Sequence, residues 1–396
     1  MAEPRPYTII DADTHVTEVP DLWTSRVPAR MRDRVPRVEW DEEKQEQAWY
    51  IGDEWINSVG ITAVAGWKDP YPGHPPTYED AHPGSYDAHA RLDYMDSLGI
   101  WAMVLYPNVG GFGNQVFGRL DDHEAKLACV RAYNDFLIDW SSADRRRLIP
   151  VMTLPYWDVA AAVAEIERSA AAGHRGVLFT GEPHSFGMPL LADRHWDPIW
   201  AAAQDCDLPV SFHIGSGDFG DEFSPDRVEV DGYAATCARA GAKIFMDNGA
   251  HVLDLLFSGI LERFPKLRFV SVESGVGWLP FLLESADYQF KAMNVRGERD
   301  DFKLLPSEYF RRQVYACCWF ETITSDAIVS RIGEDNILFE TDYPHPTSIF
   351  AEEVHETIES SLGTLTEPIR RKLLWDNAER LYQIEAPEER HSAADA

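Results

Sequence analysis

Residues 9–18 read IIDADTHVTE, and the interpretation of the whole fold starts from this stretch. The apolar segment Tyr7–Ile10 runs directly into Asp11, Asp13 and His15. This pattern predicts a buried strand with three polar side chains at its end. Burying carboxylates without partners is costly, so these side chains need a compensating partner in the folded protein.

Strand-like and helix-like segments alternate along the rest of the chain. Each of the first seven strand-like segments is followed by helical sequence, and the eighth leads into C-terminal helices. Eight parallel strand–helix units are the content of a TIM barrel, so we expect an α/β fold of the (β/α)8 type. An open, doubly wound sheet is the alternative, but no G-x-G-x-x-G motif follows the first strand. The eight predicted strands lie near residues 8, 102, 149, 177, 210, 268, 314 and 337.

One segment interrupts this regular order. Residues 20–90 are rich in Pro, Gly, Trp and Tyr and follow the first strand, so in a barrel they insert at the carboxyl-terminal face. We interpret them as a lid on a single domain of residues 1–384, followed by a polar, disordered tail at 385–396. The aromatic and imidazole side chains of the insertion either line a pocket for a flat ring or form the lid's own core: Trp55, Trp67, Tyr71, His74, Tyr78 and His82.

Composition excludes several classes of partner. The chain has 396 residues, a net charge of −30 and a pI near 4.7, so nucleic acid and anionic membranes would repel it. No run of 18 apolar residues predicts a transmembrane helix, and no leader is visible at the N-terminus. The five cysteines are odd in number and lack C-x-x-C spacing, which fits a reduced, cytoplasmic compartment.

Polar residues gather where the predicted strands end. Asp13 and His15 are two apart and point to the same side of the first strand, His213 ends the fifth, and Asp342 ends the eighth. In a barrel these ends converge, which brings two carboxylates and two imidazoles together. Nitrogen and oxygen ligands with open positions suit one catalytic divalent ion, Zn²⁺ or Mn²⁺. A single Asp or His at a strand end would not predict a metal, but the four together do.

Further residues are candidates for supporting roles. Glu273 ends the sixth strand, Asp11 is placed to orient a ligand or to cap the barrel floor, and Glu18 and His345 are candidates for the pocket rim. Trp319 and Phe320 end the seventh strand and are candidates to face the site, whereas Cys317 and Cys318 are interpreted as packing residues. The unranked candidates for binding a substrate carboxylate are Arg175, Arg239 and Arg296.

Several motifs resemble the amidohydrolase superfamily. They are the Asp-x-His on the first strand, the His on the fifth, and T-D-Y-P on the eighth. The run LLFSGILERFPKLRFVSVESG and the segment WDNAERLY resemble the amidohydrolase-2 group, which includes aminocarboxymuconate semialdehyde, resorcylate and 5-carboxyvanillate decarboxylases. The likeness covers residues 7 to about 384, apart from the insertion.

The resemblance implies roles for individual residues. Asp13, His15, His213 and Asp342 would bind the metal, with Asp13 at a position where many relatives have His. The fourth strand ends in FTGEP without a lysine, which favours one metal ion over two. Relatives carry a catalytic His at the end of the sixth strand, where this chain has Glu273. Glu273 is therefore the first candidate to handle a proton, and His251 the second.

Two reactions fit one metal with open positions. We expect decarboxylation of a small, aromatic or unsaturated carboxylate. The alternative is hydrolysis of an amide, lactone or vinylogous C–C bond by a metal-activated water, with Asp342 as the base. A third hypothesis is a binding protein whose catalytic site has drifted. The resemblance also implies a homo-oligomer, a dimer or tetramer.

Overall fold

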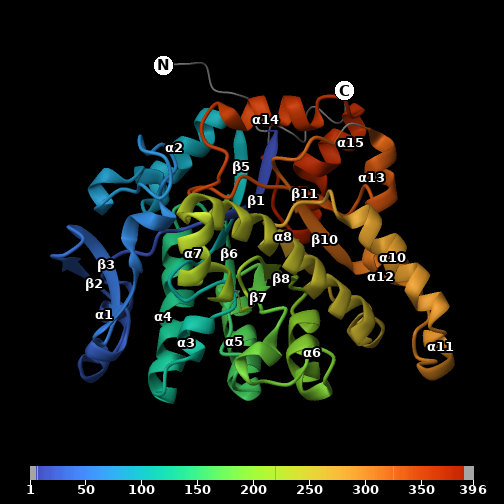
Figure 1. The fold of residues 1–396 in the computed structure, drawn as a ribbon, viewed down its shortest axis with the longest axis horizontal. Helices are drawn as coiled ribbons and strands as arrows, with labels where there is room; N and C mark the ends of the chain where they lie inside the picture. Colours follow the sequence, from blue (N-terminus) through green and yellow to red (C-terminus); the bar gives the residue numbers. More distant parts are fainter. Residues whose placement is uncertain (1–5, 7, 219, 324, 388–396) are drawn as a thin grey trace.

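Eight parallel strands form the main sheet, in the order β1-β5-β6-β7-β8-β9-β10-β11. The computed structural model describes residues 6, 8–218, 220–323 and 325–387. A strand lies at each of the eight predicted positions, and helices lie between them (Figure 1). The strands are β1 (Ile9–His15), β5 (Ile100–Tyr106), β6 (Leu148–Thr153), β7 (Gly176–Leu178), β8 (Val210–His213), β9 (Phe269–Val272), β10 (Val314–Cys318) and β11 (Ile337–Phe339).

The first and last strands meet and close the sheet. Thr14 and Tyr343 form a parallel bridge. The backbone N–H of Asp342 donates to the carbonyl of Asp13 (3.1 Å), and the N–H of His15 donates to the carbonyl of Tyr343 (2.7 Å). The sheet is therefore a (β/α)8 TIM barrel, which confirms the predicted fold class.

The helices form the outer layer of the barrel. Local sequence explains where they begin and end: in α5, the Asp158 carboxylate accepts from the Ala161 N–H, and Gly173 ends the helix at φ 119°. The helices up to β9 are α1 (Leu22–Arg26), α2 (Ala88–Leu98), α3 (Gln115–Gly118), α4 (His123–Ser141), α5 (Val159–Ala172), α6 (Asp197–Asp205), α7 (Pro225–Asp231), α8 (Tyr233–Ser258) and α9 (Ile260–Arg263). Those after β9 are α10 (Leu279–Ala292), α11 (Val295–Glu298), α12 (Pro306–Gln313), α13 (Asp326–Ile332), α14 (Glu353–Leu362), α15 (Glu367–Arg371) and α16 (Asn377–Tyr382).

The interior of the barrel is a packed core at one end. Apolar side chains from the starts of the strands, such as Ile10 and Ala102, pack with Trp375, Leu381 and Tyr382 of the C-terminal helices. These helices close the amino-terminal end of the barrel. The carboxyl-terminal end is left for polar side chains, as is usual for TIM-barrel active sites.

The insertion contains structure that the sequence did not predict. It holds a three-stranded antiparallel sheet of β2 (Arg37–Asp41), β3 (Glu46–Ile51) and β4 (Glu54–Ser58). This sheet lies beside α1 at the edge of the molecule (Figure 1), where the rings of Trp23 and Trp49 pack edge-to-face at 5.2 Å. Trp55 and Tyr71 are 40% and 43% exposed.

Several residues of the insertion contact barrel residues near the site, and the Ala65 N–H donates to the carbonyl of Pro344 (3.1 Å). The Tyr78 hydroxyl donates to the carbonyl of Glu18, and His82 Nδ1 lies 2.6 Å from the Tyr343 hydroxyl. His74 instead pairs with Glu46 of the small sheet at 2.7 Å. The role of the insertion as a lid stays a prediction.

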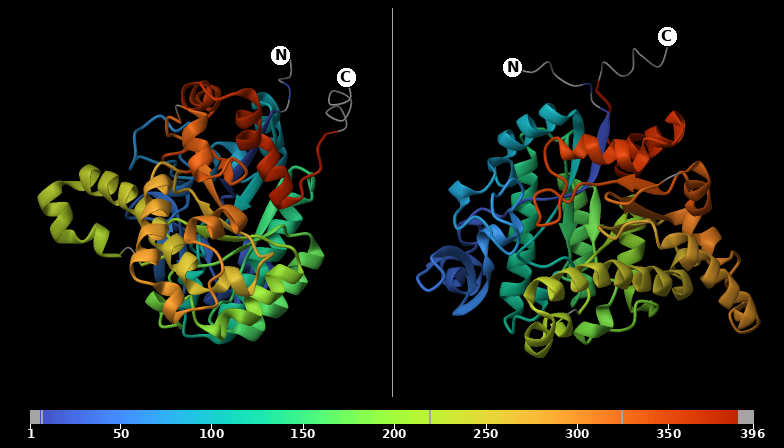
Figure 2. Two further views of the ribbon diagram at one scale, coloured as in Figure 1. Left: turned by 90° about the vertical axis from the view of Figure 1, so that its right-hand side faces the viewer. Right: turned by 45° about the horizontal axis from the view of Figure 1, so that its top comes forward.

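Helix α8 is the longest helix and extends beyond the barrel. It runs from Tyr233 to Ser258, and its first part projects with α7 from the body of the protein (Figure 2). Gly241 and Gly249 lie within it, although each lowers helix propensity by about 1 kcal/mol. Gly249 is tolerated because it packs against Trp278.

Two remaining predictions concern the chain ends and membranes. Residues 388–396 of the predicted tail lie outside the described residues, whereas the carbonyl of Glu385 accepts a hydrogen bond from Trp101 Nε1 (2.8 Å). Among the described residues, no helix is both long enough and apolar enough to span a bilayer.

Candidate metal centre

Four predicted ligands meet at the carboxyl-terminal end of the barrel. Asp13 and His15 end β1, His213 ends β8, and Asp342 follows β11; all four are fully buried. We call these four residues the metal cluster. Its centre is the pair His15 and His213, whose Nε2 atoms are 3.2 Å apart.

The carboxylates surround this imidazole pair. His15 Nε2 lies 3.6 Å from Asp13 Oδ1 and 3.5 Å from Asp342 Oδ1. His213 Nε2 lies 3.5 Å from Asp13 Oδ2. Ligand atoms of Asp13, His15 and His213 thus lie within 4.8 Å of one another, whereas Asp342 belongs to a second, overlapping group that shares His15.

The other ring nitrogen of each histidine fixes its orientation. His15 Nδ1 lies 2.9 Å from the carbonyl of Pro107, and His213 Nδ1 lies 2.9 Å from the carbonyl of Ile214. A carbonyl only accepts, so each Nδ1 carries the proton and each Nε2 presents its lone pair to the cluster. This is the tautomer that binds a metal ion.

The carboxylates lack the hydrogen bonds that buried charges require. Among the described residues, neither oxygen of Asp13 or Asp342 has a hydrogen-bond partner. His345 Nδ1 lies 2.8 Å from Asp342 Oδ1, but without hydrogen-bond geometry. Two buried and unsatisfied carboxylates beside two aligned imidazoles fit one divalent cation, which would supply the missing charge.

Two further side chains reach the same point. Glu273 places a ligand atom within 4.8 Å of those of Asp13, His15 and His213, and its Oε2 lies 3.4 Å from His213 Nε2. His345 forms a second group, within the same distance, with His15, Glu273 and Asp342. Glu273 and Asp342 both adopt left-handed backbone conformations, at φ 57° and 59°. Such strain in non-glycine residues is typical of functional sites. The Glu340 carboxylate accepts the Glu273 N–H (3.1 Å) and supports this conformation.

Burial and crowding shift the pKa values of these groups in the absence of a cation. Burial, then the charges of Asp342 and Asp13, raises the pKa of Glu273 well above its usual range, and burial raises that of Asp342 as well. Burial, then the neighbouring His345 and His213, holds the pKa of His15 well below its usual range. A bound cation would favour the ionised carboxylates and the neutral imidazoles.

Asp11 lies directly behind the metal cluster. Its carboxylate accepts from the Thr341 N–H (3.0 Å), the Thr341 hydroxyl (2.6 Å) and the Asp13 N–H (3.3 Å). It therefore forms hydrogen bonds to both backbone segments that carry Asp13 and Asp342. A residue that orients metal ligands is expected to make such contacts. Glu18 is also buried, and its Oε1 accepts the N–H groups of Asn108 and Val109.

His251, the second candidate for proton transfer, lies in a different environment. Its Nε2 is 3.4 Å from Glu182 Oε1, and its Nδ1 is 3.1 Å from Asn248 Oδ1. The adjacent His251 imidazole lowers the pKa of Glu182 to about 2. The described contacts thus pair His251 with Glu182, and bring Glu273 to the metal cluster.

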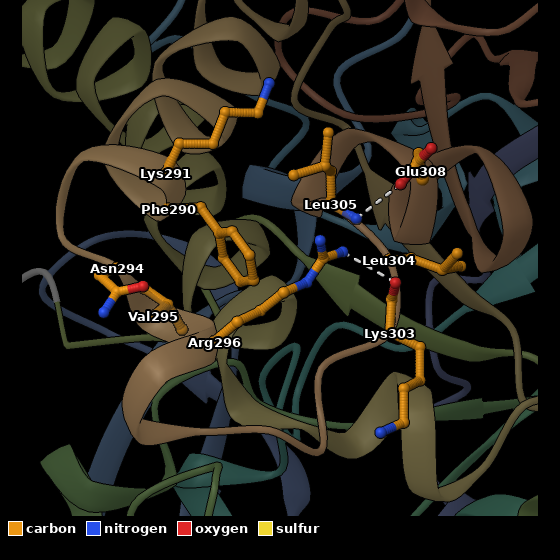
Figure 3. Close-up of a pocket in the computed structure, with 9 residues that line it drawn as sticks. All are labelled: Phe290, Lys291, Asn294, Val295, Arg296, Lys303, Leu304, Leu305 and Glu308. Carbon is orange, nitrogen blue, oxygen red and sulfur yellow. Dashed lines mark hydrogen bonds between the residues drawn. The ribbon is translucent and has the colours of Figure 1, made fainter.

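The remaining predicted residues lie elsewhere. Arg175 precedes β7, at the opposite end of the barrel, and Arg239 pairs with Glu222. Arg296 lines a surface cavity of about 560 Å³ at α10–α12, where it donates to the carbonyls of Phe302 and Lys303 (Figure 3). Trp319 and Phe320 pack on Phe245 of α8. Cys317 and Cys318 are buried, as expected for packing residues.

The structure adds one residue that the sequence analysis missed. Phe112, in the loop after β5, stacks on His213 with ring centroids 4.3 Å apart and meets His15 edge-on at 5.3 Å. It is partly exposed, whereas the histidines beneath it are buried. The phenylalanine therefore covers the metal cluster. Its setting, VGGFGN at 109–114, has no pattern that would have singled it out.

A closed TIM barrel with a His/Asp cluster at its carboxyl end defines a class of metal-dependent enzymes. Comparison with known families agrees: the model of the amidohydrolase family matches residues 10–384. The chain belongs to this family and is an enzyme of the amidohydrolase superfamily.

Individual relatives are 20% to 27% identical to this chain. A gamma-resorcylate decarboxylase from Polaromonas sp. (strain JS666) is 27% identical over 301 residues, which cover 74% of this chain and 86% of the relative. A solved amidohydrolase from Mycobacterium avium subsp. paratuberculosis K-10 is 25% identical with a TM-score of 0.73, covering 95% of this chain and 99% of that one. The manganese-bound 5-carboxyvanillate decarboxylase from Novosphingobium aromaticivorans has the same fold, at 20% identity and a TM-score of 0.66, covering 95% and 97%.

Proposed function

We propose that this protein is a metal-dependent, non-oxidative decarboxylase of a small aromatic or unsaturated carboxylate. The observation that carries the proposal is the metal cluster, in which two unsatisfied carboxylates and two aligned imidazoles converge. Relatives named as resorcylate decarboxylases support the reaction type. Hydrolysis with a metal-activated water is the alternative that the test below separates.

One divalent cation, Mn²⁺ or Zn²⁺, would be held by Asp13, His15, His213 and Asp342. When bound, it supplies a Lewis acid that orients the substrate carboxylate and an adjacent oxygen. Two carboxylate ligands give the site hard oxygen donors, which favours Mn²⁺ over Zn²⁺. Manganese in related structures supports the same choice.

Glu273 is proposed to deliver the proton. The residue is 6% exposed and follows β9, and its carboxyl lies 3.4 Å from His213, so it is within reach of a substrate bound there. The proton adds to the carbon that carries the carboxylate; the bond to the carboxylate then breaks, its electron pair stays on that carbon, and CO₂ leaves. The product carries a C–H bond in place of the carboxylate, and Glu273 regains a proton from solvent.

The first test is metal content together with product analysis. Elemental analysis should find about one Mn or Zn per chain, lost in the Asp13→Ala/His213→Ala variant. The metal-loaded protein should release CO₂ from hydroxybenzoates and leave amides and lactones intact. Hydrolysis without CO₂ release would replace this proposal with the hydrolase. If the protein binds no metal after reconstitution, both the decarboxylase and the hydrolase are contradicted. A binding protein whose catalytic site has drifted is then favoured.

The second test separates Glu273 from His251. Glu273→Gln should keep the bound metal and lower kcat by about 100-fold or more, the range expected for loss of a general acid. His251→Gln is the matched control and should lower kcat by much less. The reverse order of effects would assign the proton transfer to His251.

A further inference from the structure

His251 is a buried residue to which the proposed reaction gives no part. It lies on α8 and is 2% exposed. Its ring stands between two oxygen atoms: Nδ1 is 3.1 Å from Asn248 Oδ1, and Nε2 is 3.4 Å from Glu182 Oε1. A polar ring buried this deeply is held by its polar partners, so these two contacts define what the residue can do.

The hydrogen bonds of Asn248 fix the orientation of its amide. Asn248 is fully buried, and its Nδ2 lies within hydrogen-bond distance of three groups: the Phe212 carbonyl (3.1 Å), Ser271 Oγ (2.7 Å) and the Val272 carbonyl (3.4 Å). Because carbonyls only accept, the amide nitrogen must face them and Oδ1 must face His251. The Nδ1–H of His251 therefore donates a hydrogen bond to Asn248 Oδ1.

The Asn248 amide binds the backbone at the ends of two neighbouring strands. Phe212 precedes His213 at the end of β8, and Val272 ends β9 and precedes Glu273. Regular pairing of these two strands stops at His213 and Val272. Asn248 thus adds hydrogen bonds at the point where the pairing ends. They hold the backbone of His213 beside that of Glu273, and the side chains of these two residues lie 3.4 Å apart.

The loops after β7 and β8 leave room for the pair formed by His251 and Glu182. A Cβ atom at Gly181 would lie 2.3 Å from the His251 ring, and one at Gly217 would lie 2.6 Å from Glu182 Oε2. A larger residue at either position would therefore displace one member of the pair. Glu182 Oε2 also accepts the Asp218 N–H (3.4 Å), which joins the pair to the loop after β8. The His251 ring is thereby held on the side opposite to its Nδ1 contact.

We propose that His251 and Asn248 are positioning residues that set the separation of His213 and Glu273. His251 donates to Asn248, and the Asn248 amide binds the backbone next to both of the other residues. The inference rests on the proposed function, which makes His213 a metal ligand and Glu273 the proton donor. Small displacements matter at such a site, because a misplacement of about 1 Å can lower a rate by about 100-fold. His251 thus acts on the metal cluster through the backbone and not as a proton carrier.

The first test compares two buried asparagines by competition with a chelating dye. Asn248→Ala should lower the affinity for Mn²⁺ by about 10-fold, as loss of a residue that orients ligands does. Asn377→Ala is the matched control, because Asn377 is also fully buried and donates to two carbonyls, but at the amino-terminal end of β11. It should lower the Tm as Asn248→Ala does and leave the affinity unchanged. An unchanged affinity in Asn248→Ala, or an equal loss in both variants, would overturn the proposal.

The second test separates the two ring nitrogens of His251. The amide of His251→Asn lies near the position of Nδ1 and can still donate to Asn248, whereas the amide of His251→Gln lies near that of Nε2 and faces Glu182. His251→Asn should therefore keep the wild-type affinity for Mn²⁺. His251→Gln should lower it by about 5-fold, as loss of one hydrogen bond would do. The reverse order would make the contact with Glu182 the important one and contradict the route through Asn248.

Crystal structures of the metal-free proteins provide a test without metal or turnover. The distance between His213 Nε2 and Glu273 Oε2, 3.4 Å in the wild type, should be longer in Asn248→Ala and unchanged in Asn377→Ala. CO₂ release is measured separately. If the wild type releases no CO₂ but the affinities follow the expected order, the reaction is rejected and the positioning role is kept. If the wild type binds no metal, a longer distance in Asn248→Ala supports the proposal and an unchanged one overturns it.

Discussion

Asp11 and Thr341 are joined by two hydrogen bonds, from the Thr341 N–H and hydroxyl to the two carboxylate oxygens. They link β1 to the residue just before Asp342, and Asp11 also accepts from the Asp13 N–H. One buried side chain thus holds in position Asp13 and Asp342, two proposed ligands that come from the two ends of the fold.

Replacing Asp11 should therefore weaken metal binding although it is not a ligand. Asp11→Ala is expected to lower Mn²⁺ affinity by about 10- to 100-fold, the range for residues that orient ligands. Competition with a chelating dye measures it. Thr341→Val removes only one of the two bonds and should cost less. Unchanged affinity in Asp11→Ala would show that barrel closure alone positions Asp13 and Asp342.

Metal should stabilise the wild-type fold and fail to stabilise a ligand variant. A ligand at 100 times its Kd contributes about 2.7 kcal/mol, so saturating Mn²⁺ should raise the Tm by several degrees. Asp13→Asn removes a buried, unsatisfied charge and a ligand. Thermal melts with and without Mn²⁺ should then coincide for this variant. A wild-type Tm that is indifferent to Mn²⁺ and Zn²⁺ would argue against the cluster as a metal site.

Phe112 should control access to the metal. The Phe112 ring covers His213 and His15, so the metal can leave only when the loop that carries this ring moves. Phe112→Ala removes the ring and is expected to speed the loss of metal to excess EDTA by about 10-fold. Stopped-flow measurement with a metal-sensitive dye gives the rate. Phe320→Ala, which removes a half-exposed ring at α8, is the control and should leave the rate unchanged.

His174 should make the fold sensitive to acid. It is buried between α5 and β7, and burial lowers its pKa from 6.5 to about 4. The unfolded chain binds the proton first as the pH falls, so stability present above pH 6.5 is lost between about pH 6.5 and 4. The difference corresponds to about 3 kcal/mol.

Urea unfolding at pH 7.5 and pH 4.5 measures this effect. His174→Asn should lose less free energy of unfolding than wild type over that interval. His195→Asn replaces an exposed histidine and should behave as wild type. Equal losses in all three proteins would mean that other groups account for the acid sensitivity.

The barrel and the convergence of its strand-end side chains were predictable from sequence because their signals are local. Each strand is a short apolar run, and the polar residue that ends it, such as His213 or Asp342, follows directly. A barrel brings the carboxyl ends of its strands together, independently of the conformation of its loops. The small sheet of the insertion was not predictable, since β2 and β4 are only five residues long and Ser58 is the only buried residue in either strand.

Contacts between distant segments escaped prediction for a different reason. The stacking of Phe112 on His213 depends on a loop conformation, which the glycine-rich sequence at 109–114 leaves open. The position of the His251 side chain was not predictable either. Because His251 precedes the sixth strand, the sequence allowed it to reach the site, but in the structure its ring contacts Glu182 and Asn248.

Closure of the barrel between β1 and β11 has a consequence for protein synthesis. Asp13 and Asp342 are 329 residues apart (342 − 13), so at about 5–20 residues per second a ribosome needs roughly 15 to 65 s to make the second after the first. A nascent chain lacks Asp342, the proposed fourth ligand, until its last strand emerges, and so does any chain released early. The full set of proposed ligands therefore exists only in a chain that has been made through β11.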